Sequence, residues 1–266
     1  MKLTTLWWGT AGLLCMICGC ATPIQPAPFQ PPASASVPRP PAQTITPVAP
    51  AKPVKPRETG WTHRVITEDE LADLYFNDPQ LTPGEVKRIL SRLNLRDRYL
   101  IGDDIRHNRP MKVPNDFHFY RDWSPLPTWK AELKCWPKSI LVVKDLSYVG
   151  WYEQGQQVGN TMVCLGVRGQ ETQSGIFPIL EKDPDHHSRS YKNSYGEAAW
   201  MPWAMRIYEA VWIHAGDITD KLCSHGCVSL PLEDAEGLFQ WTDVGTPVII
   251  VESLEDVRAA LTGATR

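Results

Sequence analysis

His214-Ala-Gly-Asp-Ile-Thr-Asp-Lys-Leu-Cys-Ser-His-Gly-Cys-Val-Ser-Leu230 is the stretch around which the rest of this 266-residue chain can be placed. The apolar run 211–213 comes directly before it, and Val228 and Leu230 follow Cys227. An apolar run, a polar loop and a second short apolar run are typical of two strands joined by a loop. The stretch therefore predicts a histidine at the end of one strand and a cysteine at the start of another.

Cys227 is a candidate nucleophile, because a thiol that a nearby base or positive charge converts to thiolate can perform acyl transfer. Two imidazoles are available. His214 lies across a loop that lets the chain fold back, and His225, two positions from Cys227, shares its face on an extended backbone. We favour His214 as the base, since its ring can approach the sulfur freely. Gly226 allows a tight turn, so its N–H and that of Cys227 are candidates for an oxyanion hole.

A zinc site is the rival interpretation of the same segment, whose candidate ligands are His214, Cys223, His225 and Cys227. The short Cys-x-x-Cys and His-x-x-x-His spacings of common zinc sites are missing from it. The pattern therefore favours thiol chemistry without a metal or cofactor. We interpret His186 and His187 as a pair of histidines in a solvated polar loop.

The pattern His-Ala-Gly followed by Ser-His-Gly-Cys-Val-x-Leu-Pro resembles that of the L,D-transpeptidases of bacterial cell walls, the YkuD-domain family. Further stretches resemble this family in the same order, within about residues 136–252: 139–155, 172–177, 201–206 and 248–251. Two positions depart from the family pattern. Gln173 stands where proline is usual, and Ser229 stands where Arg or Asn is usual.

The resemblance implies a mainly β, barrel or sandwich catalytic domain that acts on peptidoglycan stem peptides. A cysteine attacks the third residue of a tetrapeptide stem, releases D-alanine and passes the acyl group to an amine, on a second stem for a 3→3 cross-link or on a lipoprotein. The resemblance places Cys227 as the nucleophile and His214 as the general base and acid. The remaining site residues that it implies are Ser224, His225 and Gly226 in the loop, and Trp203, Met205, Arg206 and Ser229 toward the substrate.

Two other functions remain open at this point. The same thioester resolved by water makes an L,D-carboxypeptidase or an amidase that releases a wall-attached lipoprotein. The second alternative is a non-catalytic tether that only binds peptidoglycan. The sequence does not choose between amine and water, because that depends on the shape and wetness of the cleft.

Residues 1–20 are typical of a secretion signal that ends in a lipobox, in which Cys20 becomes the lipid-modified first residue of the mature protein. Ala21 rather than Asp then favours a lipid anchor on the periplasmic face of the outer membrane. Residues 21–60 hold twelve of the 24 prolines and predict an extended, disordered linker.

Residues 61–130 predict a small α-rich domain, in which Thr67 and Thr82 are each followed by a helix start signal. A strand, two short helices and a strand ending in Val-Pro resemble a LysM peptidoglycan-binding module, and a helical domain that packs on the catalytic part is the alternative. Beyond it we predict a helix from 231 or 232 to about 241, a tail at 253–266, and strands at 140–143, 148–152, 161–167, 175–180, 208–214, 226–230 and 248–251.

Charge and cysteine content bound the remaining interpretations. A net charge of −3 gives no global attraction to nucleic acid. Of the seven cysteines, those outside the signal, the lipobox and the nucleophile are Cys135, Cys164 and Cys223. This odd set leaves two candidate bonds, Cys135–Cys164 and a reversible Cys223–Cys227 bond that would switch an enzyme off.

Overall fold

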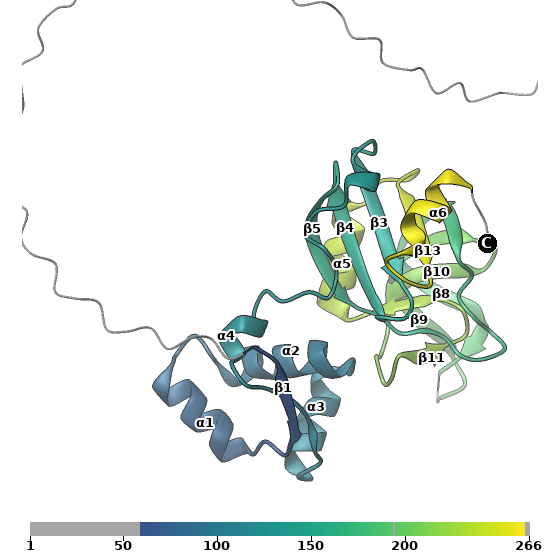
Figure 1. The fold of residues 1–266 in the computed structure, drawn as a ribbon. Coiled ribbons are helices and arrows are strands. Elements are labelled where there is room, and N and C mark those ends of the chain that lie inside the picture. Colours follow the sequence, from purple (N-terminus) through teal and green to yellow (C-terminus); the bar gives the residue numbers. More distant parts are fainter. Residues whose placement is uncertain (1–58, 194, 264–266) are drawn as a thin grey trace, which may run out of the picture. The chain divides into compact units, whose positions relative to one another are not determined.

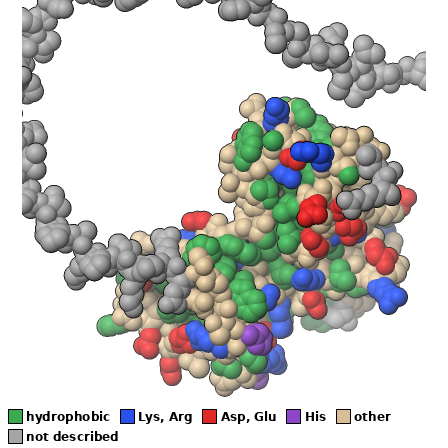
Figure 2. Space-filling view, in the orientation of Figure 1, with side chains coloured by type: hydrophobic (Ala, Val, Ile, Leu, Met, Phe, Trp, Pro, Cys, Tyr) green, Lys and Arg blue, Asp and Glu red, His purple; other side chains and the backbone are tan. Residues whose placement is uncertain are grey.

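The computed structural model describes residues 59–193 and 195–263, in which a helical lobe (61–120) precedes a β-rich domain (138–251) (Figure 1). The predicted signal and nearly all of the predicted linker, with the lipidation at Cys20, lie outside the described residues. On the visible face, acidic and basic side chains are interspersed (Figure 2). No helix among the described residues is long and apolar enough to span a membrane.

The helical lobe is closed by a short antiparallel pair of strands with three helices between them (Figure 1). Its elements are β1 (Trp61–Arg64), α1 (Glu68–Asn77), α2 (Pro83–Asn94), α3 (Arg98–Arg106), β2 (Met111–Pro114) and α4 (Phe117–Tyr120). The side chains of Thr67 and Thr82 accept hydrogen bonds from backbone N–H groups of the first turns, which confirms the predicted caps. The sequence predicted two helices here, and α3 is the third, which that interpretation missed.

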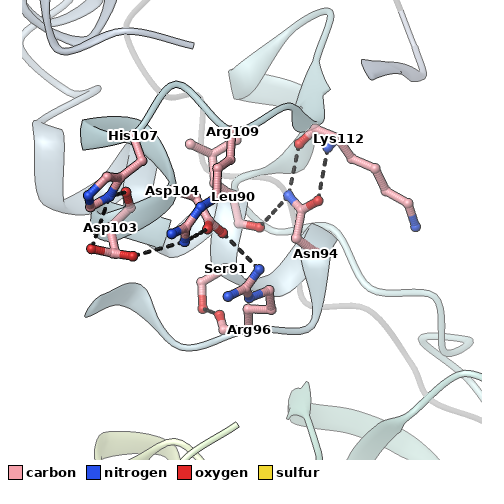
Figure 3. A network of polar contacts seen from close by, with 9 residues as sticks. All are labelled: Leu90, Ser91, Asn94, Arg96, Asp103, Asp104, His107, Arg109 and Lys112. Carbon is pink, nitrogen blue, oxygen red and sulfur yellow. Dashed lines mark hydrogen bonds and ion pairs between the residues drawn. The ribbon is translucent and has the colours of Figure 1, made fainter. Parts of the chain in front are cut away.

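A buried carboxylate fixes the turn between α2 and α3 (Figure 3). Asp104 is only 3 % exposed, and its oxygens lie 3.0 Å from Arg96 Nη1 and 3.0 Å from Arg109 Nη1. Asn94, in the last turn of α2, donates to the carbonyl oxygen of Lys112 and accepts from its N–H, each at 2.9 Å. Because two arginines offset the charge of Asp104, its burial rigidifies the turn at residues 95–97.

The β-rich domain contains two main sheets and one small one (Figure 1). One sheet has the order β5-β4-β3-β13-β7 and comprises β5 (Gln156–Met162), β4 (Tyr148–Glu153), β3 (Lys138–Val143), β13 (Pro247–Val251) and β7 (Gly175–Pro178). The other has the order β12-β10-β9-β8 and comprises β12 (Val228–Leu230), β10 (Val211–Ala215), β9 (Ala198–Tyr208) and β8 (Glu181–Lys192). The small sheet pairs β6 (Leu165–Gly166) with β11 (Leu222–Ser224), and the helical elements are η1 (Ala131–Leu133), α5 (Leu232–Trp241) and α6 (Asp256–Thr262).

Continuous apolar runs in β3 and β13 reflect burial on both faces of the five-stranded sheet. Along β13, Val248 and Ile250 join the core shared with β9, β10, β12 and α5. Ile249 and Val251 point the other way, into a second core with Tyr148 and the C-terminal segment. The mainly β fold with a small α-rich N-terminal part is confirmed.

The sequence interpretation was wrong about two segments. The residues assigned to a polar loop around 186–187 belong to β8, which pairs with β9 in a long antiparallel hairpin. Most of β8 is polar and partly exposed, so it lacks the alternation that identifies a strand. The predicted tail at 253–266 contains the helix α6, whose Val257 is fully buried.

Both predicted disulfides are wrong. Cys164 is bonded to Cys223, with 5.6 Å between their Cα atoms, whereas Cys135 and Cys227 are free. The pairing follows from the small parallel sheet, because Leu165 and Leu222 are register partners and bring the neighbouring cysteines together. The bond therefore ties the segment before the nucleophile to the core of the domain.

The Cys164–Cys223 bond closes a loop of 59 residues, for which chain entropy predicts a contribution of about 4 kcal/mol to the free energy of unfolding. We expect the double variant Cys164→Ala, Cys223→Ala to lose most of this stability in urea denaturation. The matched control is Cys135→Ala, which removes an exposed free thiol. Equal stability of the double variant and the control would contradict a stabilising role for the bond.

Candidate active site

The candidate site is built on the parallel pairing of β10 with β12. In this register Ile213 lies opposite Val228, and His214 lies opposite Ser229. Successive side chains of a strand point to opposite faces. Ile213 and Val228 belong to the domain core. His214 and Ser229 therefore point to the outer face.

Cys227 lies on that same outer face, next to Trp212. Extended by one residue, the β10–β12 register places Trp212 level with Cys227, and the two side chains pack together with Met201 and Ala204. Trp212 and His214 are two residues apart on β10 and share a face. The strand register thus places the side chains of His214 and Cys227 on one face.

His214 is held as a neutral imidazole with a defined tautomer. Its Nδ1 lies 2.7 Å from the carbonyl oxygen of Ala215, which can only accept, so Nδ1 carries the hydrogen. Burial lowers the pKa of His214 to about 4, although the bond to Ala215 opposes the shift and the nearby His186 adds to it. At neutral pH, Nε2 therefore offers a lone pair that can take a proton.

Cys227 is a protonated thiol in this resting geometry. Burial raises the pKa of its thiol, and a hydrogen bond to the backbone of Trp212 lowers it in part. Because His214 is buried and Cys227 is half-buried, the uncharged thiol and imidazole are favoured over a thiolate and an imidazolium.

Two hydroxyl groups hold the loop that carries the nucleophile. Ser224 Oγ donates to the carbonyl oxygen of Cys227 at 2.6 Å and accepts from the N–H of Gly226 at 3.2 Å. Thr172 is fully buried, and its Oγ1 donates to the carbonyl oxygen of Gly226 at 2.9 Å and accepts from Gly166 N at 3.0 Å. Gly226 has a φ of +113°, which explains the glycine at this turn.

The predicted oxyanion hole needs one correction. The N–H of Gly226 is directed to Ser224 Oγ and is not free for a ligand. The N–H of Cys227 makes no hydrogen bond to any residue that the structure describes. Of the two amides named from the sequence, that of Cys227 is the one left to hold an oxyanion.

The prediction that Trp203, Met205 and Arg206 line a substrate groove is wrong for Met205. Its side chain is fully buried in the domain core, since β9 points it inward. Trp203 packs against that core, and the centroid of its ring lies 5.3 Å from the ring centroid of Phe239 in α5. Arg206 Nε pairs with Glu181 Oε1 at 3.0 Å, across the β8–β9 hairpin.

The remaining candidate residues lie around His214 and Cys227. The exposed ring of His225 stacks on Tyr191 of β8 at 4.2 Å. Ser229 is nearly buried beside Gly216, in the loop that follows His214. The zinc interpretation is overturned, because Cys223 is bonded to Cys164 and is not available as a thiolate ligand.

Three residues near the pair were not identified from the sequence as site residues. The ring of His186 stacks on Trp212 at 4.0 Å, and its Nδ1 lies 3.1 Å from Asp183. Thr172 holds the nucleophile loop. Trp212 and Thr172 both lie in stretches used for the strand and family interpretations, whereas His186 had no pattern that could reveal its role.

Comparison with known proteins identifies the β-rich domain. Residues 137–250 match the family model of the YkuD L,D-transpeptidase catalytic domain. No match is found among the curated proteins. The chain thus carries a domain that matches the L,D-transpeptidase catalytic domain over residues 137–250.

Solved L,D-transpeptidases are similar to this chain at low identity. An Enterococcus faecium L,D-transpeptidase mutant has 23 % identity and a TM-score of 0.39, over 44 % of this chain and 50 % of that chain. The Stackebrandtia nassauensis enzyme has 21 % identity and a TM-score of 0.44, over 63 % of this chain and 76 % of that chain. The Mycobacterium smegmatis enzyme has 20 % identity and a TM-score of 0.39, over 43 % of this chain and 58 % of that chain. This chain thus spans half of the Enterococcus chain.

A raised thiol pKa predicts the pH dependence of alkylation. We expect the rate at which iodoacetamide modifies Cys227 to climb with pH through and above the usual thiol range near about 8.5, because only the thiolate reacts. Peptide mass spectrometry separates this reaction from that of Cys135, which is also free. A rate that is already at its plateau below pH 7 would contradict the resting thiol and indicate a thiolate–imidazolium pair.

Proposed function

We propose that this chain is a peptidoglycan L,D-transpeptidase in which Cys227 forms a thioester with a tetrapeptide stem. The observation that carries the proposal is the arrangement of Cys227 and neutral His214 on one face of paired strands, within a domain of the L,D-transpeptidase family. Ordered hydroxyls around the loop support it, because a nucleophile held in place needs less reorganisation to react.

In the first half of the reaction, His214 Nε2 takes the proton of the Cys227 thiol as the sulfur attacks the carbonyl carbon of the third stem residue. The carbonyl oxygen becomes an oxyanion that the N–H of Cys227 stabilises. When the intermediate collapses, the bond to the terminal D-alanine breaks. His214 returns its proton to the departing amine, and the acyl group remains on sulfur.

In the second half, an amine of the acceptor attacks the thioester. His214 Nε2 takes a proton from the attacking nitrogen, an amide bond forms, and the carbon–sulfur bond breaks. The same proton then returns to the sulfur of Cys227, so the enzyme is regenerated. Water in place of the amine would give a carboxypeptidase, which the assay below detects.

The proposed location is the cell envelope. A lipid anchor at Cys20 and a proline-rich spacer at 21–60 are supported by the sequence pattern, and they would let a membrane-bound domain reach peptidoglycan. The anchor would hold the chain at the periplasmic face of the outer membrane. Wall-attached lipoprotein is a second class of acceptor under this proposal.

The deciding experiment incubates the full chain with a disaccharide-tetrapeptide and follows intact protein and products by mass spectrometry. We expect an acyl adduct on Cys227, loss of D-alanine and a cross-linked dimer, all absent in Cys227→Ala. Cys135→Ala is the matched control, because its thiol is free but exposed, and it should behave as the unmodified chain. We expect His214→Ala to lower the acylation rate by a factor of about 100 or more.

Two other outcomes of this experiment would assign a different function to the chain. An adduct with loss of D-alanine and no dimer moves the assignment to an L,D-carboxypeptidase. Absence of both adduct and product, with retained binding of intact peptidoglycan by Cys227→Ala, favours the tether and overturns the proposal.

A further inference from the structure

A cavity of about 480 Å³ lies between the helical lobe and the segment that follows His214. One wall comes from the start of α3 and carries Asp97, Arg98 and Tyr99. The opposite wall includes Asp217, just beyond β10, and Glu233 in the first turn of α5. The volume suits a side chain or a short peptide segment rather than a single water molecule.

This cavity is continuous with the surroundings of the candidate base. Its lining includes Ala215, whose carbonyl oxygen accepts from His214, and Gly216. A Cβ built on Gly216 would lie 3.3 Å from His214 Cε1, so the backbone here passes against the imidazole. A group bound in the cavity would therefore lie against the segment that follows His214.

Two contacts fix the wall that the helical lobe supplies. The N–H of Asp97 donates to the carbonyl oxygen of Ile218 at 2.9 Å, and Asp97 Oδ2 accepts from the N–H of Ile218 at 2.5 Å. Arg98 pairs with Glu233 at 2.8 Å, from one wall to the other. The turn before them is held by the Asp104 network of Figure 3, which includes Arg96. The wall is therefore pre-organised.

The chemistry of the lining favours a cation. Arg98 is paired with Glu233, and among the described residues neither Asp97 nor Asp217 forms an ion pair. Asp97 accepts from the N–H of Ile218, and the hydroxyl of Tyr99 hydrogen-bonds to the carboxylate of Asp217. Burial raises the pKa of Asp97 to about 6, and the charge of Asp217 adds to the shift. Beside them, Tyr99 and Trp200 are 55 % and 58 % exposed, and aromatic faces attract ammonium groups.

We propose that this cavity binds a primary ammonium group of a stem peptide, and that the helical lobe thereby contributes to stem-peptide binding. The proposal rests on the proposed transferase function for its biological meaning. An ammonium group is compact, and its three donors suit two carboxylates and an aromatic face. Tyr99 is then a binding residue contributed by the lobe, and Asp217 is one contributed by the β-rich domain.

Binding can be measured without turnover in the full chain carrying Cys227→Ala. The probes are a blocked lysine-containing tripeptide whose only charge is its side-chain ammonium, and the same peptide with that amine acetylated. By calorimetry, we expect the ammonium peptide to bind at least about tenfold more tightly. We expect Asp217→Asn to weaken it about tenfold and Tyr99→Ala about threefold.

Matched controls separate this effect from general changes of charge and surface. Glu236→Gln removes an exposed carboxylate from α5 outside the cavity, and Tyr75→Ala removes an exposed tyrosine from α1. Neither should change the affinity for the ammonium peptide. Equal affinity for the two peptides, or no loss in either cavity variant, overturns the proposal.

Failure of this inference is distinguishable from failure of the proposed function. If the unmodified chain forms the thioester but the two peptides bind alike, the transferase assignment stands and the ammonium site is rejected. If the ammonium peptide binds selectively but no thioester forms, the site stands and the transferase assignment is rejected.

Discussion

The parallel register between β10 and β12 is the constraint on which the rest of this site depends. It sends Ile213 and Val228 into the core and leaves His214 and Cys227 on the outer face. A slip of one residue in either strand would move the core residues to the outer face, so the apolar core enforces the placement of His214 and Cys227. The Cys164–Cys223 bond then restrains the segment that leads to the nucleophile.

Burial determines the chemistry of the pair. It favours the uncharged forms of both groups, and therefore lowers the pKa of His214 and raises that of Cys227. The Ala215 carbonyl fixes the tautomer, which leaves Nε2 as the proton acceptor. A cavity lined by residues of the helical lobe and by Ala215 and Gly216 lies against the segment that follows His214.

Much of the fold and the central pair could be predicted from the sequence, because local patterns encode them. The apolar runs in β3 and β13, the threonine caps at Thr67 and Thr82, and the spacing from His214 to Cys227 are all local signals. Features that arise only from tertiary contacts were missed or wrong. The Cys164–Cys223 bond depends on pairing between β6 and β11, and Met205 points inward because of its place in β9. The polar strand β8 carries no alternation to reveal it.

The central claim is that burial holds His214 as a neutral imidazole with the hydrogen on Nδ1. Nitrogen-15 NMR of the histidine-labelled full chain, followed as a function of pH, measures both the tautomer and the pKa of this ring. We expect an imidazole with its hydrogen on Nδ1 and none on Nε2, which stays neutral down to about pH 5 and takes a proton only near a pKa of about 4. A ring that titrates near the ordinary value of about 6.5, or one that carries its hydrogen on Nε2, would contradict it.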